Sequence, residues 1–175
     1  MGNYKFIISG IIFAVFIGIV LFDAGYKNGS QNDLSHAAEK ASSSVVNIFI
    51  SSRGINATRN AVGSGVIFSK EGHIVTNTHI LTNARSVFVE FNDGEITEAV
   101  LIGADKYSDI AVLKINGFEG LNPIESAESS NIRVGDEVLA IGNPFGVGKT
   151  VTSGIISATG RDYGNPYLEL LQTDA

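Results

Sequence analysis

The chain has 175 residues, of which 44% are hydrophobic, and a formal net charge of −6 at pH 7. This hydrophobic content disfavours a disordered chain, and a negative charge without a cluster of Lys or Arg disfavours a nucleic-acid partner. The absence of cysteine excludes disulfides, thiolate zinc sites and cysteine nucleophiles.

The first predicted element is an uncharged apolar segment at residues 6–22, FIISGIIFAVFIGIVLF, preceded by Lys5. Its length and hydropathy predict one transmembrane helix. Because the positive charge lies on the amino-terminal side, residues 1–5 are expected in the cytoplasm and the rest of the chain outside. A cleaved export signal is the alternative, but a cut after Ala24 would place Phe22 where a small residue is required.

Residues 23–44 are predicted to form a polar tether that ends in a short helix. The stretch DAGYKNGSQND is small, polar and rich in turn-forming residues. Asp33 is expected to cap the helix, which would run through Leu34 and Ala37 to Lys40.

From residue 45 onward, alternating apolar residues predict short β-strands. Turns rich in Gly and Asn separate these strands, and Asn92-Asp93-Gly94 is a strong hairpin signal. Such spacing is typical of an antiparallel barrel or sandwich. The alternation is lost between Gly117 and Asn131, so a domain boundary is expected there. The predicted strands cover residues 46–50, 66–68, 74–76, 87–91, 96–102, 110–115, 137–142 and 150–160.

Two residues at strand ends suit acid–base chemistry. His79 closes the run GSGVIFSKEGHIVTNTHIL, and Asp109 opens DIAVLKI further along the chain. A serine nucleophile needs an imidazole to take its proton and a carboxylate to orient that imidazole. His79 and Asp109 are therefore candidates for these two roles. Considered as two isolated residues, a histidine and an aspartate in such places are more often part of a surface turn and a strand cap.

The sequence around both residues is specific enough to indicate a family. The motifs are GSGVIFSKEGHIVTNTHI, SDIAVLKI, VGDEVLAIGNPFGVGKTVTSGIISATGR and LQTDA. From about residue 45 to the end, they resemble the trypsin-like serine proteases and, within them, the HtrA branch, most closely its membrane-anchored, DegS-type subgroup. The resemblance implies an all-β fold of two antiparallel barrels, the first complete over residues 45–126 and the second partial over residues 127–175.

The same resemblance implies a serine endopeptidase of the bacterial envelope that acts in protein quality control or stress signalling. His79 matches the general base and Asp109 the orienting acid, whereas Asp105 matches neither and is expected in a surface turn. The implied partners are unfolded or regulatory envelope proteins and the inner membrane, with the protease domain in the periplasm and the full-length protein a homotrimer. Neither a cofactor nor a metal is implied.

In the family, the sequence LQTDA leads directly into the segment that carries the nucleophilic serine. The chain is therefore expected to be the amino-terminal part of a longer protein and to be inactive by itself. A second barrel that is cut midway is also expected to leave strand edges unpaired.

The remaining serines and histidines are not expected to take part in this chemistry. Ser64, Ser153 and Ser157 lie in glycine-rich strands or turns that match structural positions of the family. His36 and His73 have no neighbour in the sequence pattern that would indicate a metal site.

A competing motif lies at Gly148, Lys149 and Thr150, which resemble the end of a phosphate-binding P-loop. A P-loop would also require glycine in place of Asn143 and a helix after Thr150. The residues after Thr150 alternate like a strand, so nucleotide binding is not expected. The remaining alternative to an endopeptidase is a non-catalytic, protease-like module that binds envelope proteins.

Overall fold

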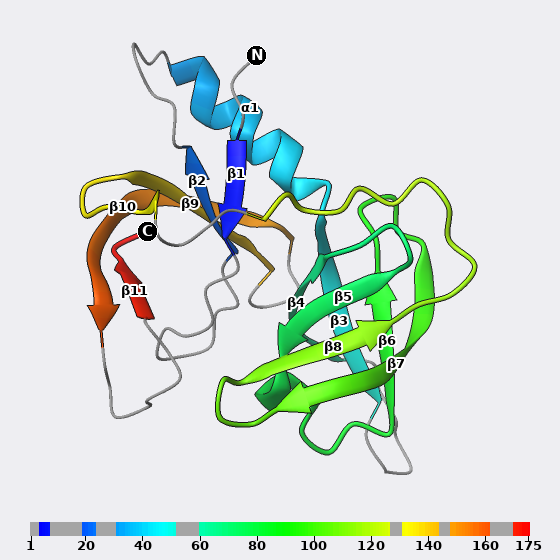
Figure 1. The fold of residues 1–175 in the computed structure, drawn as a ribbon. Coiled ribbons are helices and arrows are strands. Elements are labelled where there is room, and N and C mark those ends of the chain that lie inside the picture. The colour runs from blue at the N-terminus through cyan, green and yellow to red at the C-terminus, as the bar shows by residue number, and fades with distance from the viewer. Residues whose placement is uncertain are drawn as a thin grey trace.

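The computed structural model describes residues 4–7, 19–23, 31–51, 60–126, 131–143, 148–161 and 170–175. These residues form a closed β-barrel, a second β-sheet, a short 3-10 helix and one α-helix, α1 (Gln31–Ser42), which lies above the second sheet in Figure 1 and ends at the barrel. The all-β class that the sequence predicts is confirmed.

The barrel consists of six antiparallel strands: β3 (Val45–Ser51), β4 (Asn60–Ile67), β5 (His73–Asn77), β6 (Ser86–Glu90), β7 (Ile96–Asp105) and β8 (Ile110–Lys114). Their order around the barrel is β3-β4-β5-β8-β7-β6, and closure leaves no unpaired edge. Each of these strands overlaps one that the alternation predicts. The alternation places small and branched apolar side chains inside the barrel, namely Val46, Ile48, Ile67, Ile74, Ile80, Val87, Val89, Ala99, Leu113 and Ile115.

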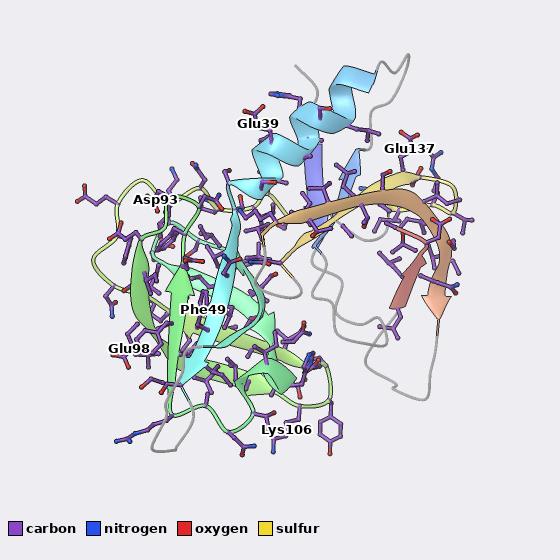
Figure 2. All side chains as sticks on the ribbon, turned by 180° about the vertical axis from the view of Figure 1, so that it is seen from behind. Glu39, Phe49, Asp93, Glu98, Lys106 and Glu137 are labelled. Atoms are coloured by element: carbon purple, nitrogen blue, oxygen red, sulfur yellow. The ribbon has the colours of Figure 1, made fainter. Side chains whose placement is uncertain are left out.

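Two hairpin turns of the barrel depend on glycine. Gly72, between β4 and β5, has a φ of +89°, and a Cβ atom there would lie 2.6 Å from the carbonyl oxygen of Ile115. Gly94 ends the predicted Asn92-Asp93-Gly94 turn with a φ of +86°, and its Cβ position is open space. In Figure 2, Asp93 lies at the end of the barrel nearest α1 and Lys106 at the opposite end.

The second sheet has five antiparallel strands in the order β1-β2-β9-β10-β11, where β1 covers Tyr4–Ile7 and β2 covers Ile19–Asp23. Three of them come from the last part of the chain: β9 (Glu137–Gly142), β10 (Thr150–Arg161) and β11 (Leu170–Thr173). The sequence pattern predicts β9 and β10 but not β11. Buried side chains of α1 pack against both the barrel and the second sheet. Together they form one hydrophobic cluster of Ala37, Ala41, Val45, Val66, Ile124, Leu139 and Ile141.

The predicted transmembrane helix over residues 6–22 is not confirmed. The described ends of this segment are strands, β1 (Tyr4–Ile7) and β2 (Ile19–Asp23), which pair antiparallel with each other. Strand β2 also pairs with β9, with Ile19 opposite Ile141. No helix among the residues described above has both the length and the hydropathy needed to cross a bilayer. The physical reason for the difference is that Ile, Val and Phe also favour strands, so a sheet edge competes with lipid for this segment.

Two smaller expectations also change. Helix α1 begins at Gln31, so Asp33 lies inside the helix rather than at its cap. The sequence predicts unpaired strand edges in the partial second barrel, but β9 is paired on one side with β2 and on the other with β10. Strands β2 and β9 therefore satisfy each other's backbone hydrogen bonds along this edge.

Candidate active site

Strand pairing brings His79 and Asp109 together although 30 positions separate them in the sequence. Strand β5 ends at Asn77, and the short 3-10 helix η1 (Thr78–Leu81) follows it and carries His79. Strand β8 begins directly after Asp109, and Asn77 pairs with Ile110 across the two antiparallel strands. The end of one strand and the start of its partner therefore present the two side chains at the same edge of the barrel.

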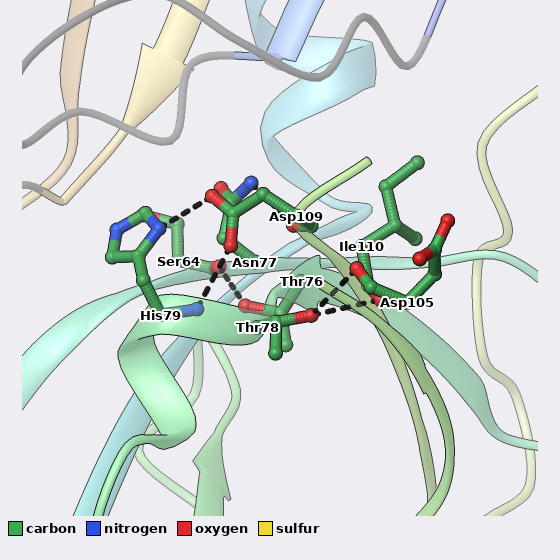
Figure 3. A network of polar contacts seen from close by, with 8 residues as sticks. All are labelled: Ser64, Thr76, Asn77, Thr78, His79, Asp105, Asp109 and Ile110. Carbon is green, nitrogen blue, oxygen red and sulfur yellow. Dashed lines mark hydrogen bonds and ion pairs between the residues drawn. The ribbon is translucent and has the colours of Figure 1, made fainter. Parts of the chain in front are cut away.

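Both oxygens of the Asp109 carboxylate bind His79, as Figure 3 shows. Oδ2 lies 2.5 Å from the ring nitrogen Nδ1, and Oδ1 accepts the backbone N–H of His79 at 2.9 Å. The His79 side chain is 60% exposed and that of Asp109 is 29% exposed. A partly shielded carboxylate thus fixes both the position and the orientation of an accessible imidazole.

This geometry selects one form of the neutral imidazole. A carboxylate only accepts hydrogen bonds, so Nδ1 of His79 must carry the proton that lies between the ring and Asp109. The other ring nitrogen, Nε2, is then the one with a lone pair. An imidazole arranged in this way can accept a proton at Nε2 from a hydroxyl group.

Asn77 and Thr78, just before His79, bind the backbone of Asp109. This role was not predicted from the sequence. The carbonyl oxygen of Asp109 accepts two hydrogen bonds, from Asn77 Nδ2 at 2.9 Å and from the backbone N–H of Thr78 at 3.1 Å. The Thr78 hydroxyl donates to the carbonyl oxygen of Ile110 at 2.9 Å. The polar run Thr-Asn-Thr before the histidine was the available signal, because three polar residues at the end of a buried strand need partners.

The backbone at Asp109 is also unusual, with a φ of +56°. Among residues other than glycine, Asp and Asn tolerate this left-handed conformation best. The nearby Asp105 instead caps the surface turn, as expected, because its carboxylate accepts from the Tyr107 N–H and the Ser108 hydroxyl, each at 2.9 Å. These hydrogen bonds lower the pKa of the exposed Asp105 carboxyl.

Ser64 and His73, which are not expected to take part in catalysis, make structural contacts. Ser64 is 1% exposed, and its hydroxyl oxygen accepts the backbone N–H of Asn143 at 2.7 Å. Ser69 Oγ lies 2.7 Å from Nδ1 of His73, within the turn that joins β4 to β5. This Ser–His contact uses the ring nitrogen nearer the backbone and connects two residues of a single hairpin, which is typical of a turn-stabilising contact.

The P-loop alternative is not supported by the residues that the structure describes on either side of 144–147. Strand β10 begins at Thr150, where a phosphate site would require a helix. The ammonium group of Lys149 is directed into the protein and donates to the carbonyl oxygens of Ser42 and Val45 and to Oδ1 of Asn92. Burial lowers the pKa of Lys149 to about 8.

Comparison with known families agrees with this arrangement. Residues 63–175 match the model of the trypsin-like peptidase domain, a span that includes both His79 and Asp109. Among solved structures, the HtrA-type protease AlgW with a tripeptide has a TM-score of 0.71 and 43% sequence identity, over 81% of this chain and 46% of that chain. A second AlgW structure, with a decapeptide, has a TM-score of 0.72 and 38% identity, over 81% of this chain and 51% of that chain.

Curated relatives belong to the same group. Serine endoprotease DegS of Escherichia coli (strain K12) is 44% identical over 147 residues, which are 79% of this chain and 41% of that protein. Periplasmic serine endoprotease DegP of the same strain is 48% identical over 118 residues, 66% of this chain and 25% of that protein. The chain spans less than half the length of these relatives. It belongs to the trypsin-like peptidase family and, within that family, to the HtrA type.

Proposed function

We propose that this chain supplies the general base, His79, and the orienting acid, Asp109, of a serine endopeptidase. The observation that carries the proposal is the two-point contact of the Asp109 carboxylate with the Nδ1 atom and the backbone N–H of His79, at 2.5 and 2.9 Å. This carboxylate leaves the Nε2 side of an imidazole that is 60% exposed available to a hydroxyl group. Membership of a peptidase family supports the same assignment.

In the proposed reaction, a serine hydroxyl attacks the carbonyl carbon of a peptide bond while its proton moves to Nε2 of His79. The resulting imidazolium ion is stabilised by the Asp109 carboxylate. Nε2 then delivers the proton to the leaving amine as the C–N bond breaks, which leaves an acyl-enzyme that water hydrolyses. These steps use side chains alone and require neither a metal nor a cofactor.

The nucleophilic serine of this proposal lies in a part of the protein beyond residue 175. Ser64 is a poor candidate because it is buried and its Oγ is already bound by Asn143. The second sheet is the proposed start of a second barrel, with the division from the first barrel near residue 126. Residues 1–175 by themselves are therefore expected to lack triad-dependent activity.

We further propose that the substrates are unfolded or regulatory proteins of the bacterial envelope. The support is that the relatives include an endoprotease described as periplasmic and HtrA-type structures with bound peptides. Residues 6–22 would anchor the protein in the inner membrane, with residues 23–44 as tether and helix and with the protease domain in the periplasm. A homotrimer is the proposed assembly of the full-length protein.

The test uses the longer reading frame that encodes this chain. Cleavage of casein is measured for the expressed protein and for the variant His79→Ala, which should lose activity by a factor on the order of 10⁶. The matched control is His36→Ala, an exposed histidine on α1, which should cleave casein like the parent protein. Undiminished cleavage by His79→Ala would refute the assignment.

A non-catalytic module that binds envelope proteins is the other outcome of this test. It is favoured if the DNA after the codon for Ala175 contains a stop codon, and the protease is favoured if the frame continues into a serine flanked by glycines. Reading that DNA separates the two hypotheses before any protein is made.

A further inference from the structure

Asn143, the residue after strand β9, binds the first barrel with its backbone and its side chain. It is 3% exposed. Its backbone N–H donates to Ser64 Oγ at 2.7 Å, and its Nδ2 donates to Asn47 Oδ1 at 2.9 Å. Its Oδ1 accepts the backbone N–H of Gly148 at 3.1 Å. Asn47 lies on β3 and Ser64 on β4, so one buried residue of the second sheet binds two strands of the barrel.

The side-chain bonds form a row with a fixed direction. Asn47 Nδ2 donates to the Glu90 carboxylate at 2.7 Å, so the oxygen of the Asn47 amide must face Asn143. Asn143 must then present its NH₂ group to Asn47 and its oxygen to the N–H of Gly148. An acceptor at one end, Glu90, and a donor at the other end, Gly148, therefore determine the orientation of both amides.

The same buried residue is connected to the strand that carries the imidazole. The carbonyl oxygen of Ser64 accepts the Thr76 hydroxyl at 2.8 Å, a contact drawn in Figure 3. Thr76 is 3% exposed and lies on β5, which leads into η1 and His79. Hydrogen bonds thus run from Asn143 through Ser64 to Thr76. Buried polar networks whose members are all satisfied specify one relative arrangement of the elements that they join.

We propose that Asn143 is a positioning residue that fixes the second sheet against the barrel that carries the His79–Asp109 pair. This inference rests on the proposed function. His79 and Asp109 both belong to the first barrel, whereas the proposed nucleophile belongs to the second. The distance from the nucleophile to Nε2 of His79 is therefore fixed only if the second sheet packs against the first barrel in one arrangement. A shift of about 1 Å in such an arrangement costs roughly 10²-fold in rate.

The experiment exploits the direction of the row, in the expressed longer protein. Asn143→Asp keeps the acceptor for Gly148 but cannot donate to Asn47, and should lower kcat for casein by about 10- to 100-fold with little change in KM. Glu90→Gln can still accept from Asn47 and should retain the kcat of the parent protein. In the variant that combines both substitutions, the new amide at position 90 donates to Asn47. The Asn47 amide then turns over and donates to the new carboxylate at position 143, so kcat should recover.

Further measurements distinguish positioning from general damage and from failure of the proposed function. The tautomer of the His79 imidazole, read by nitrogen-15 NMR, should be the same in Asn143→Asp and the parent, because its partner Asp109 lies in the barrel. The control variant Asn131→Ala, at an exposed position, should retain full kcat. Casein cleavage that does not require His79 would overturn the proposed function. If cleavage requires His79, an unimpaired Asn143→Asp, or a double variant no better than Asn143→Asp alone, would overturn the positioning role.

Discussion

The carboxylate of Asp109 binds His79 at two points, the ring nitrogen Nδ1 and the backbone N–H. The backbone contact fixes where η1 begins relative to β8, and the ring contact fixes the tautomer. One side chain therefore links the local fold of the His79 segment to the protonation state of its imidazole.

Replacement of Asp109 by Asn should separate these two functions. Asn tolerates the φ of +56° and can still accept the His79 N–H, but its NH₂ group would donate to Nδ1 and move the ring proton to Nε2. We expect kcat in the longer protein to fall by about 10⁴-fold while the fold is retained. Nitrogen-15 NMR of the imidazole should report the exchanged tautomer. The control Asp105→Asn alters only the surface turn and should leave both readouts unchanged, and an unaltered tautomer in Asp109→Asn would contradict the prediction.

The Thr78 hydroxyl should contribute to stability through its bond to the carbonyl oxygen of Ile110. Thr78→Val preserves shape and removes this donor, so the free energy of unfolding should fall by about 1 kcal/mol. Urea denaturation measures the change. Thr82→Val, at an exposed position directly after η1, is the matched control and should change stability little. Equal stability of the two variants would show that the Thr78 contact is not needed.

Gly72 and Gly94 both have positive φ, but only Gly72 is also sterically enclosed. Alanine at either position adds the left-handed backbone penalty of about 1–2 kcal/mol. At Gly72 the new Cβ would also lie 2.6 Å from the Ile115 carbonyl oxygen, whereas at Gly94 it would meet nothing within 4 Å. Gly72→Ala should therefore lower the melting temperature clearly more than Gly94→Ala. Similar melting temperatures for the two variants would mean that the turn at Gly72 shifts without cost.

Lys149 should make stability depend on pH above neutrality. Burial lowers its pKa in the folded protein to about 8, below the unfolded value of 10.5. Between these two values the unfolded state binds more protons, so the free energy of unfolding should rise as pH increases from 8 toward 10.5. Because the side chain is only half-buried, we expect a rise of about 1 kcal/mol relative to Lys149→Met. Lys106→Met, at an exposed turn position, should keep the parent profile, and parallel profiles of Lys149→Met and the parent would contradict the assignment.

The pairing of β2 with β9 predicts different results for two amino-terminal deletions. Removal of residues 1–30 takes away β2 and exposes the edge of β9, which should promote aggregation and speed hydrogen exchange of β9 amides. Removal of residues 1–18 keeps β2 and should preserve the slow exchange. Light scattering and exchange mass spectrometry measure both effects. If the two deletions give equally fast exchange, β2 does not protect β9 in solution.

The barrel strands and the contact between His79 and Asp109 were predictable because their signals are local. Alternation marks each barrel strand within a few residues, and the sequence around His79 and Asp109 is specific to a family. The strand β11 was missed because it is only four residues long. The buried hydrogen bond between Asn143 and Ser64 joins residues that are 79 positions apart, and no pattern in the sequence predicts it.

The sequence by itself determined the all-β class and the pair of residues suited to proton transfer, because periodicity and short motifs act within one strand and one turn. Periodicity left a barrel and a sandwich open, and the closed barrel was expected only from the family resemblance. The tertiary structure decided which long-range partners those elements take. Ile, Val and Phe suit both lipid and strands, so the apolar composition of residues 6–22 did not predict that the described parts Tyr4–Ile7 and Ile19–Asp23 pair as strands. The orientation of the Asn47 and Asn143 side-chain amides likewise depends on the tertiary structure. It is set by the Glu90 carboxylate, which accepts a hydrogen bond from Asn47, and by the Gly148 N–H, which donates one to Asn143.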